Sequence, residues 1–156
     1  MRTQPGLKWM AVGLALSLGL AACKSTSSAS NGNEAVPAAL AFTQSVSLSG
    51  ANEVPPVSTS ASATGSVTVN ANRTVSARIV ATGMVATAAH IHMGAPGTNG
   101  PVIVPLTKTA DNTFIADGTP KLTPEQYAAF KAGNTYVNVH SDAHKAGEIR
   151  AQLKGS

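Results

Sequence analysis

Two neighbouring stretches decide the fold of this chain, Gly65-Ser66-Val67-Thr68-Val69-Asn70 and Thr74-Val75-Ser76-Ala77-Arg78-Ile79-Val80. Apolar and polar residues alternate in both, which is the pattern of a β-strand with one buried face. A short polar segment at residues 70–73 separates them. Because a turn of this length joins antiparallel neighbours, we predict a hairpin whose tip lies at residues 70–73.

Strand signals continue on both sides of this hairpin. They recur around residues 41–49, 88–92, 102–104, 112–116, 135–140 and 148–153. The segment Val102-Ile103-Val104 is apolar throughout, which predicts a strand that is buried on both faces. About eight short strands separated by turns predict an all-β sandwich or barrel.

One segment predicts a short helix. Thr123 can cap its start, Pro124 suits the first helical position, and Gln126 stands where a capping box needs it. Gly133 is suited to end the helix in a left-handed conformation. Two aromatic side chains of this helix are expected to face the core, Tyr127 and Phe130.

The histidines are the residues that suggest chemistry. His90-Ile91-His92 lies in one predicted strand, and Val137-Asn138-Val139-His140 lies in another. Side chains alternate between the two faces of a strand, so His90 and His92 share one face, and His140 shares a face with Asn138. Two such strands placed side by side gather three imidazoles into one patch.

Imidazole is a ligand for copper, zinc, iron and nickel, so we predict a transition-metal site of His90, His92 and His140. Copper is favoured, because Cu²⁺ stands highest in the affinity series of the divalent metals, and zinc is the alternative. A ligating histidine usually donates its second nitrogen to an oxygen, and Asn138 and Asp142 are the candidates. The alternative interpretation is that these histidines only link two strands through hydrogen bonds.

The first residues have the form of a secretory signal. Arg2 and Lys8 accompany an uninterrupted apolar run over residues 9–20, which is short for a transmembrane helix. The run ends in Leu20-Ala21-Ala22-Cys23, which resembles the lipobox of bacterial lipoprotein signals. The resemblance implies a signal peptide over residues 1–22 and lipidation of the only cysteine, Cys23. An exported protein held in the cell envelope by its lipid is therefore expected.

Residues 23–40 consist largely of Ser, Ala, Asn and Pro. Such a composition buries too little apolar surface to fold, so we predict a flexible tether over residues 23–40 and a single domain over residues 41–154. Lys24 follows the cysteine, and by similarity to bacterial sorting rules the lack of Asp there favours the outer membrane over the inner one.

Composition and motifs argue against several function classes. Of the 11 basic residues, two belong to the predicted signal, and the remainder are scattered without interleaved aromatics, so nucleic-acid binding is not expected. The sequence contains no Gly-x-Ser-x-Gly nucleophile motif and no Gly-rich phosphate loop. With only seven acidic residues, paired carboxylates for glycoside hydrolysis are also unpromising.

Several motifs, in this order along the chain, resemble the CHRD domain family, the module named after chordin. They are Leu48-Ser49-Gly50-Ala51-Asn52-Glu53-Val54-Pro55-Pro56, Ala88-Ala89-His90-Ile91-His92, Gly100-Pro101-Val102, Tyr136-Val137-Asn138-Val139-His140 and Gly147-Glu148-Ile149-Arg150-Ala151-Gln152-Leu153. The resemblance runs from about Ala41 to Leu153. It implies an immunoglobulin-like Greek-key sandwich distantly similar to Cu/Zn superoxide dismutase, but no settled biochemical function.

The dismutase similarity extends to the histidines. His90-Ile91-His92 is similar to the dismutase His-Val-His that supplies two copper ligands, and Val139-His140 is similar to its later Val-Val-His. This chain lacks counterparts of the imidazole that bridges copper and zinc, of the zinc segment and of the disulfide. His144 is then the remaining candidate for a fourth ligand, and Arg150 is comparable to the anion-guiding arginine.

Together these observations predict a non-catalytic binding module with a copper-type histidine site. Two alternatives stay open: an interaction module without metal, which binds an envelope or extracellular protein, and a dismutase-like redox enzyme. The motif at residues 50–56 carries no redox chemistry. Its expected role is structural, with Glu53 accepting backbone hydrogen bonds at a fixed corner.

Overall fold

The computed structural model describes residues 41–156. This part of the chain is all-β with one short α-helix, which confirms the predicted fold class. The predicted signal peptide (1–22), the lipidation site at Cys23 and the predicted tether (23–40) lie outside the described residues. Within residues 41–156, no helix has both the length and the apolar character needed to cross a bilayer.

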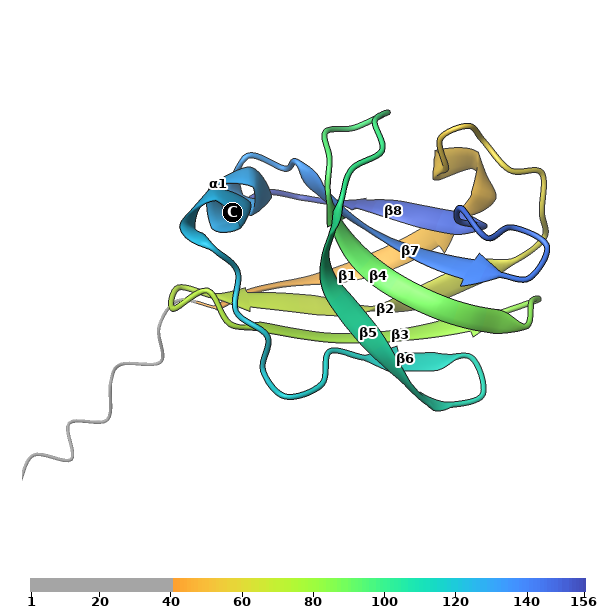
Figure 1. The fold of residues 1–156 in the computed structure, drawn as a ribbon, viewed down its shortest axis with the longest axis horizontal. Coiled ribbons are helices and arrows are strands. Elements are labelled where there is room, and N and C mark those ends of the chain that lie inside the picture. Colours follow the sequence, from red (N-terminus) through yellow and green to blue (C-terminus); the bar gives the residue numbers. More distant parts are fainter. Residues whose placement is uncertain (1–40) are drawn as a thin grey trace, which may run out of the picture. The chain divides into compact units, whose positions relative to one another are not determined.

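Eight strands close into a barrel in the order β1-β2-β3-β6-β5-β4-β7-β8, and all neighbours are antiparallel (Figure 1). The elements are, in chain order, β1 (Ala41–Ser49), the 3₁₀ turn η1 (Gly50–Asn52), β2 (Ser62–Asn70), β3 (Val75–Thr82), β4 (Ala86–Met93), β5 (Val102–Ala110), β6 (Thr113–Ile115), α1 (Pro124–Lys131), β7 (Thr135–Ser141) and β8 (Ile149–Leu153).

The strand order is that of a Greek key. Strands β4, β5 and β6 follow one another as paired neighbours. Strand β3 pairs with the far member of this group, β6, while β7 pairs with β4. The chain therefore crosses over between β3 and β4 rather than pairing them. This crossover is what places β4 beside β7.

The β2–β3 hairpin forms where the alternating pattern predicts it. Val69 pairs with Val75 at its end, and the turn between them lies within the predicted tip. Arg73 adopts a left-handed conformation with φ of 74°. The Asn72 carboxamide oxygen accepts hydrogen bonds from the backbone N–H and the hydroxyl of Thr74. The polar residues of the segment thus build the turn.

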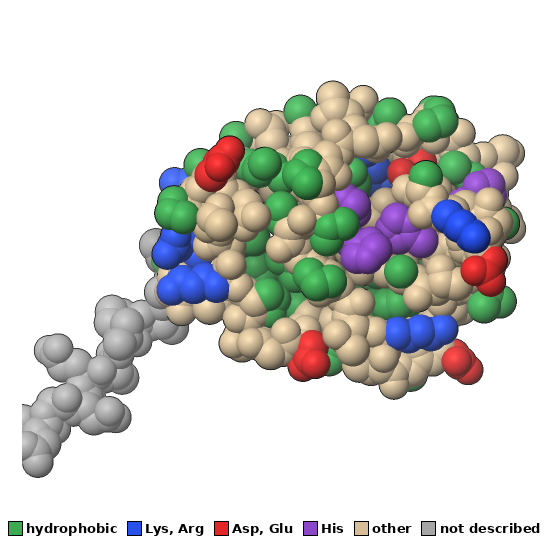
Figure 2. Space-filling view, viewed as in Figure 1, with side chains coloured by type: hydrophobic (Ala, Val, Ile, Leu, Met, Phe, Trp, Pro, Cys, Tyr) green, Lys and Arg blue, Asp and Glu red, His purple; other side chains and the backbone are tan. Residues whose placement is uncertain are grey.

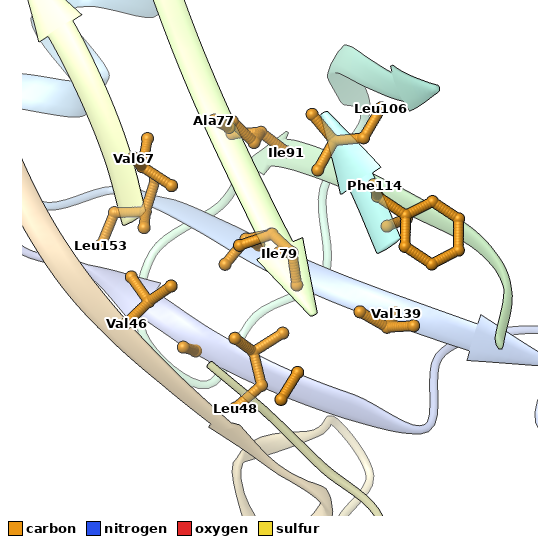
Figure 3. Packing of buried hydrophobic residues seen from close by; sticks show 14 of the residues in the cluster. Val46, Leu48, Val67, Ala77, Ile79, Ile91, Leu106, Phe114, Val139 and Leu153 are labelled. Atoms are coloured by element: carbon orange, nitrogen blue, oxygen red, sulfur yellow. The ribbon is translucent and has the colours of Figure 1, made fainter. Parts of the chain in front are cut away.

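The inward faces of the strands build one apolar core (Figure 3). Members from five different strands have no exposed surface, namely Val67, Ile79, Phe114, Val137 and Ile149. Full burial of a side chain of this size contributes about 1.5–3 kcal/mol. The core therefore joins both halves of the barrel.

The prediction that Val102-Ile103-Val104 is buried on both faces is wrong. Val104 is 1% exposed, but Val102 is 47% exposed. The β4–β5 register shifts at this point, since Ile91 pairs with Val104 and His92 pairs with Val102. A bulge of this kind turns one strand residue outward, which a run of apolar letters does not reveal.

Helix α1 begins and ends as its sequence predicts. The Thr123 hydroxyl accepts a hydrogen bond from the Gln126 N–H, and the Gln126 side chain accepts one from the Thr123 N–H. Gly133 follows the helix with φ of 75°. Phe130 is buried and Tyr127 packs at the edge of the core, so the expected face is turned inward.

Removing the cap is expected to cost a modest, measurable part of the stability. Thr123→Ala deletes the hydroxyl that accepts from Gln126, so the free energy of unfolding should fall by about 1 kcal/mol. Urea denaturation followed by circular dichroism measures this change. Thr109→Ala is the control, because Thr109 is an exposed strand residue, and its substitution should change stability by less than about 0.5 kcal/mol. Equal losses for both variants would contradict the role of the cap.

Candidate metal centre

Strands β4 and β7 bring the histidine-bearing faces together. His90 lies directly opposite Asn138, and His140 lies two residues further along β7, so the two imidazoles are diagonal neighbours. The other face of the same strands belongs to the core, where Ile91 and Val139 are buried. The predicted division into one apolar face and one imidazole face is confirmed.

His90, His92 and His140 form one cluster. Each histidine contributes one ring nitrogen, and these three nitrogens all lie within 4.8 Å of one another. His92 and His140 are each 8% exposed, while His90 is half-buried. Figure 2 shows histidine side chains gathered at the surface of the face that carries β4 and β7 in Figure 1. The cluster is therefore built into the protein but reachable from solvent.

Two backbone carbonyls determine which nitrogens are free. His92 Nδ1 lies 2.9 Å from the Gly100 carbonyl oxygen, and His140 Nδ1 lies 3.0 Å from the Lys145 carbonyl oxygen. A carbonyl only accepts, so each Nδ1 carries the hydrogen and donates it. In the neutral imidazole the remaining nitrogen, Nε2, then holds a lone pair. Metal-ligating histidines typically have this arrangement.

The ligand nitrogens of the three histidines lie near the spacing that a metal ion requires. Nitrogens bound to one ion at about 2.0–2.1 Å lie about 3.3–3.5 Å from one another. His90 Nδ1 lies 2.9 Å from His140 Nε2 and, because that nitrogen holds a lone pair, donates a hydrogen bond to it in the metal-free protein. An ion bound there would replace this hydrogen bond, and the His90 hydrogen would move to its Nε2. His92 Nε2 is buried and has no hydrogen-bond partner. All three ligand nitrogens lie within 4.8 Å of one another, so side-chain rotation would have to bring them to the spacing of a bound ion.

The surroundings keep all three imidazoles neutral. Burial, together with the neighbouring His140 and His92, lowers the pKa of His90 to about 4. Burial also lowers the pKa of His92 and of His140, although the hydrogen bonds to the Gly100 and Lys145 carbonyls oppose it. Neutral imidazole is the form that binds a metal. At neutral pH these histidines therefore need to lose no proton before binding.

The same shift predicts how the metal-free protein responds to acid. Between pH 6.5 and about 4, the unfolded chain protonates His90 while the folded protein does not. The free energy of unfolding should therefore fall as the pH drops through this window. Thermal unfolding of metal-free protein between pH 7 and pH 4 measures it. In His90→Gln the fall should be shallower, and an unchanged slope would contradict the assigned shift.

His92 is fixed by aromatic stacking as well as by its hydrogen bond. Its ring lies parallel to that of Tyr136, with 4.7 Å between centroids and 4° between planes. The Arg150 guanidinium lies 3.4 Å from the centre of the same tyrosine ring. The Gly100 N–H donates to the Tyr136 hydroxyl oxygen over 3.2 Å, so the loop that holds His92 is itself held by Tyr136. The imidazole is thus preorganised.

Arg150 is buried and hydrogen-bonded to its surroundings. Its side chain is 1% exposed and donates to the Asn99 side-chain oxygen (3.2 Å), the Thr98 carbonyl (2.9 Å) and the Gln152 side-chain oxygen (3.1 Å). Burial lowers the pKa of Arg150. Because both terminal nitrogens of the buried guanidinium already donate to neighbouring groups, Arg150 does not present the exposed guanidinium expected of an anion-guiding arginine.

The structure distributes the other predicted site residues over different places. His144 does not belong to the histidine cluster and lines a separate surface hollow of about 280 Å³ with Glu53 and Lys145. Asp142 is exposed. Asn138 is 2% exposed and lies among the histidines, but the second nitrogens of His92 and His140 go to backbone carbonyls instead.

Glu53 is buried at the corner that follows β1. The corner is held by hydrogen bonds from the Glu53 and Val57 N–H groups to the Gly50 carbonyl. Burial raises the pKa of Glu53, while the Val54 backbone, the charge of Arg150 and the Asn138 side chain lower it. Glu53 thus lies next to the residues that surround the histidines.

Three parts of the site are missed by reasoning from the sequence. They are the carbonyl groups of Gly100 and Lys145 and the ring of Tyr136. Backbone carbonyls leave no signal in a sequence. Tyr136 does leave one, because it shares the alternation that puts Asn138 and His140 on one face of β7.

The chain belongs to the CHRD domain family. A model of that family, described as the CHRD domain, matches residues 44–153, which span the barrel from β1 to the end of β8. No curated protein and no solved structure matches the chain. The histidine cluster therefore has to be interpreted from its own geometry.

Proposed function

We propose that this protein is an exported, lipid-anchored binding module whose CHRD domain holds one transition-metal ion, copper in preference to zinc, at His90, His92 and His140. The observation that carries the proposal is the arrangement of the ring nitrogens. Three of them lie within 4.8 Å of one another, and two are freed because their partner nitrogens donate to carbonyls.

The donor chemistry favours copper. All three donors are neutral imidazoles, which suit copper and zinc better than magnesium or calcium. Within residues 41–156, no cysteine or carboxylate takes part in the cluster. Cu²⁺ stands above Zn²⁺ in the affinity series of nitrogen sites. A bound ion would keep open positions, because three protein ligands do not complete its coordination.

A binding role is proposed rather than a redox enzyme. In the described part of the chain, the histidine cluster is the one group of three potential metal ligands, so a second metal beside it has no comparable support. The Arg150 guanidinium is buried and engaged. Binding and buffering of an ion need only the three imidazoles.

The location follows from the N-terminal motif. Cys23 in Leu20-Ala21-Ala22-Cys23 is proposed to carry the lipid after removal of residues 1–22, and residues 23–40 to connect it to the barrel. The proposed site of attachment is the outer membrane. Mass spectrometry of the mature protein tests this part, since an unmodified Cys23 contradicts it.

Copper titration of the purified, metal-free protein tests the metal site. We expect one equivalent of Cu²⁺ to bind, with pulsed electron paramagnetic resonance showing coupling to imidazole nitrogens. Zn²⁺ should compete more weakly. Absence of tight binding would leave an interaction module without metal, whereas superoxide turnover by the loaded protein would favour the redox alternative.

A further inference from the structure

Three buried acceptor atoms around Asn138 lack hydrogen-bond partners. They are His92 Nε2, Asn138 Oδ1 and Glu53 Oε1. The side chains that carry them are 8%, 2% and 5% exposed, respectively. Leaving such a buried group unpaired is energetically costly. Acceptors without partners that gather around one residue indicate that a hydrogen-bond donor or a cation belongs among them.

Gly147 brings Glu53 and Asn138 together. A Cβ atom at this glycine would lie 2.5 Å from Glu53 Oε1 and 2.8 Å from Asn138 Nδ2, so only a residue without a side chain leaves them room. Both atoms therefore border the same small space. Since a carboxylate attracts N–H groups and repels oxygen, Glu53 favours the carboxamide orientation that turns the NH₂ group toward itself.

This orientation leaves the carboxamide oxygen for the histidine side. Asn138 lies directly opposite His90 on the imidazole face. Its side chain also interacts with His92, whose pKa it raises, and His92 Nε2 has no hydrogen-bond partner. The Nδ1 hydrogen of His92 is already used by the Gly100 carbonyl. The oxygen of Asn138 and the nitrogen of His92 are thus two acceptors with no hydrogen to share.

We propose that Asn138 Oδ1 is a further ligand of the metal held by the three histidines, and that Glu53 is the positioning residue that turns this oxygen toward the ion. The proposal rests on the metal site described under Proposed function and adds its fourth donor. It also gives the buried carboxylate of the corner at residues 50–56 a place in the site.

The fourth donor changes which ions the site prefers. Three imidazoles and a carboxamide oxygen form a neutral four-donor set. Oxygen is a hard donor, whereas Cu⁺ is typically bound by soft sulfur ligands. The proposed set therefore favours the divalent ions Cu²⁺, Zn²⁺ and Co²⁺ over Cu⁺.

The test compares metal binding by the full chain and its variants. Co²⁺ is the probe, because its visible spectrum reports its ligands, and Zn²⁺ competition gives affinities. Asn138→Leu keeps the size of the side chain but removes the oxygen, so we expect the Zn²⁺ affinity to fall at least about 10-fold and the Co²⁺ spectrum to change. Asn138→Asp retains an oxygen donor but loses the NH₂ group beside Glu53, so its Zn²⁺ affinity should lie between those of the unmodified protein and Asn138→Leu.

Thr135→Val is the matched control. Thr135 is also a buried β7 residue with an unpartnered oxygen, but it lies at the other end of the strand from His140. Its variant should bind as the unmodified protein does. Wild-type affinity and an unchanged Co²⁺ spectrum in Asn138→Leu would overturn the ligand assignment, while failure of the unmodified protein to bind any of these ions would overturn the metal site itself.

Glu53→Gln provides a second variant should Asn138→Leu not fold. A glutamine amide can donate to Asn138 Oδ1 and withdraw it from the ion, so the Zn²⁺ affinity should again fall and the Co²⁺ spectrum should change. Wild-type values for folded Glu53→Gln would contradict the positioning role.

Discussion

His90→Gln is expected to weaken copper binding at least about 100-fold, since loss of a ligand should exceed the 10–100-fold effect of losing a ligand's hydrogen-bond partner. His90 supplies one of the three nitrogens, and its Nδ1 lies 2.9 Å from His140 Nε2, where the ion is proposed to bind. Its side chain is half-buried and has no place in the apolar core. Competition titration with a chromophoric chelator measures the change.

The matched control is His144→Gln. It makes the same chemical change in the same protein, but His144 lies outside the cluster. Its copper affinity should equal that of the unmodified protein. A loss in His144→Gln as large as that in His90→Gln would show that the ion is bound elsewhere or that His144 joins the site.

Arg150→Ala is expected to destabilise the fold by about 3–5 kcal/mol, as removal of one partner from a buried charged network does. The guanidinium is 1% exposed, packs on the Tyr136 ring and bonds the loop that carries Thr98. In the native protein the charge of Arg150 lowers the pKa of the Glu53 carboxyl group. The substitution removes this nearby cation as well. Chemical denaturation monitored by far-ultraviolet circular dichroism measures the effect.

One further variant separates packing from charge at Arg150, and a second is the control at an exposed arginine. Arg150→Lys keeps the positive charge but not the planar, multiply bonded group, so it should recover only part of the stability. Arg78→Ala removes an exposed arginine from β3 and should change stability by less than about 0.5 kcal/mol. Equal effects at Arg150 and Arg78 would contradict the role assigned to the buried residue.

The local parts of this fold could be predicted because each depends on neighbouring residues. Alternation alone places His90 and Ile91 on opposite faces, whatever the order of the strands. The cap at Thr123 and the turn before Val75 follow from short motifs in the same way. The pairing of β4 with β7 is different, because it depends on the crossover of the whole barrel.

Loop conformation limited the prediction of the site. Alternation puts Arg150 on the face turned away from the core, which suggests an exposed arginine. The structure covers that face with the loop that includes Thr98 and Asn99, so the guanidinium is buried. The same loop supplies the Gly100 carbonyl to His92. No residue pattern specifies where a carbonyl group will point.

The imidazoles lie on the outer face of β4, opposite the face that carries Ile91, and this placement has a consequence for metal exchange. The cohesion of the barrel comes from the apolar interior, to which none of the histidines contributes. A zinc finger collapses when its ion departs, because the ion replaces a core. An ion bound by these histidines would therefore be able to bind and dissociate while the barrel stays folded, and its rate of exchange would depend on access to the rings rather than on refolding.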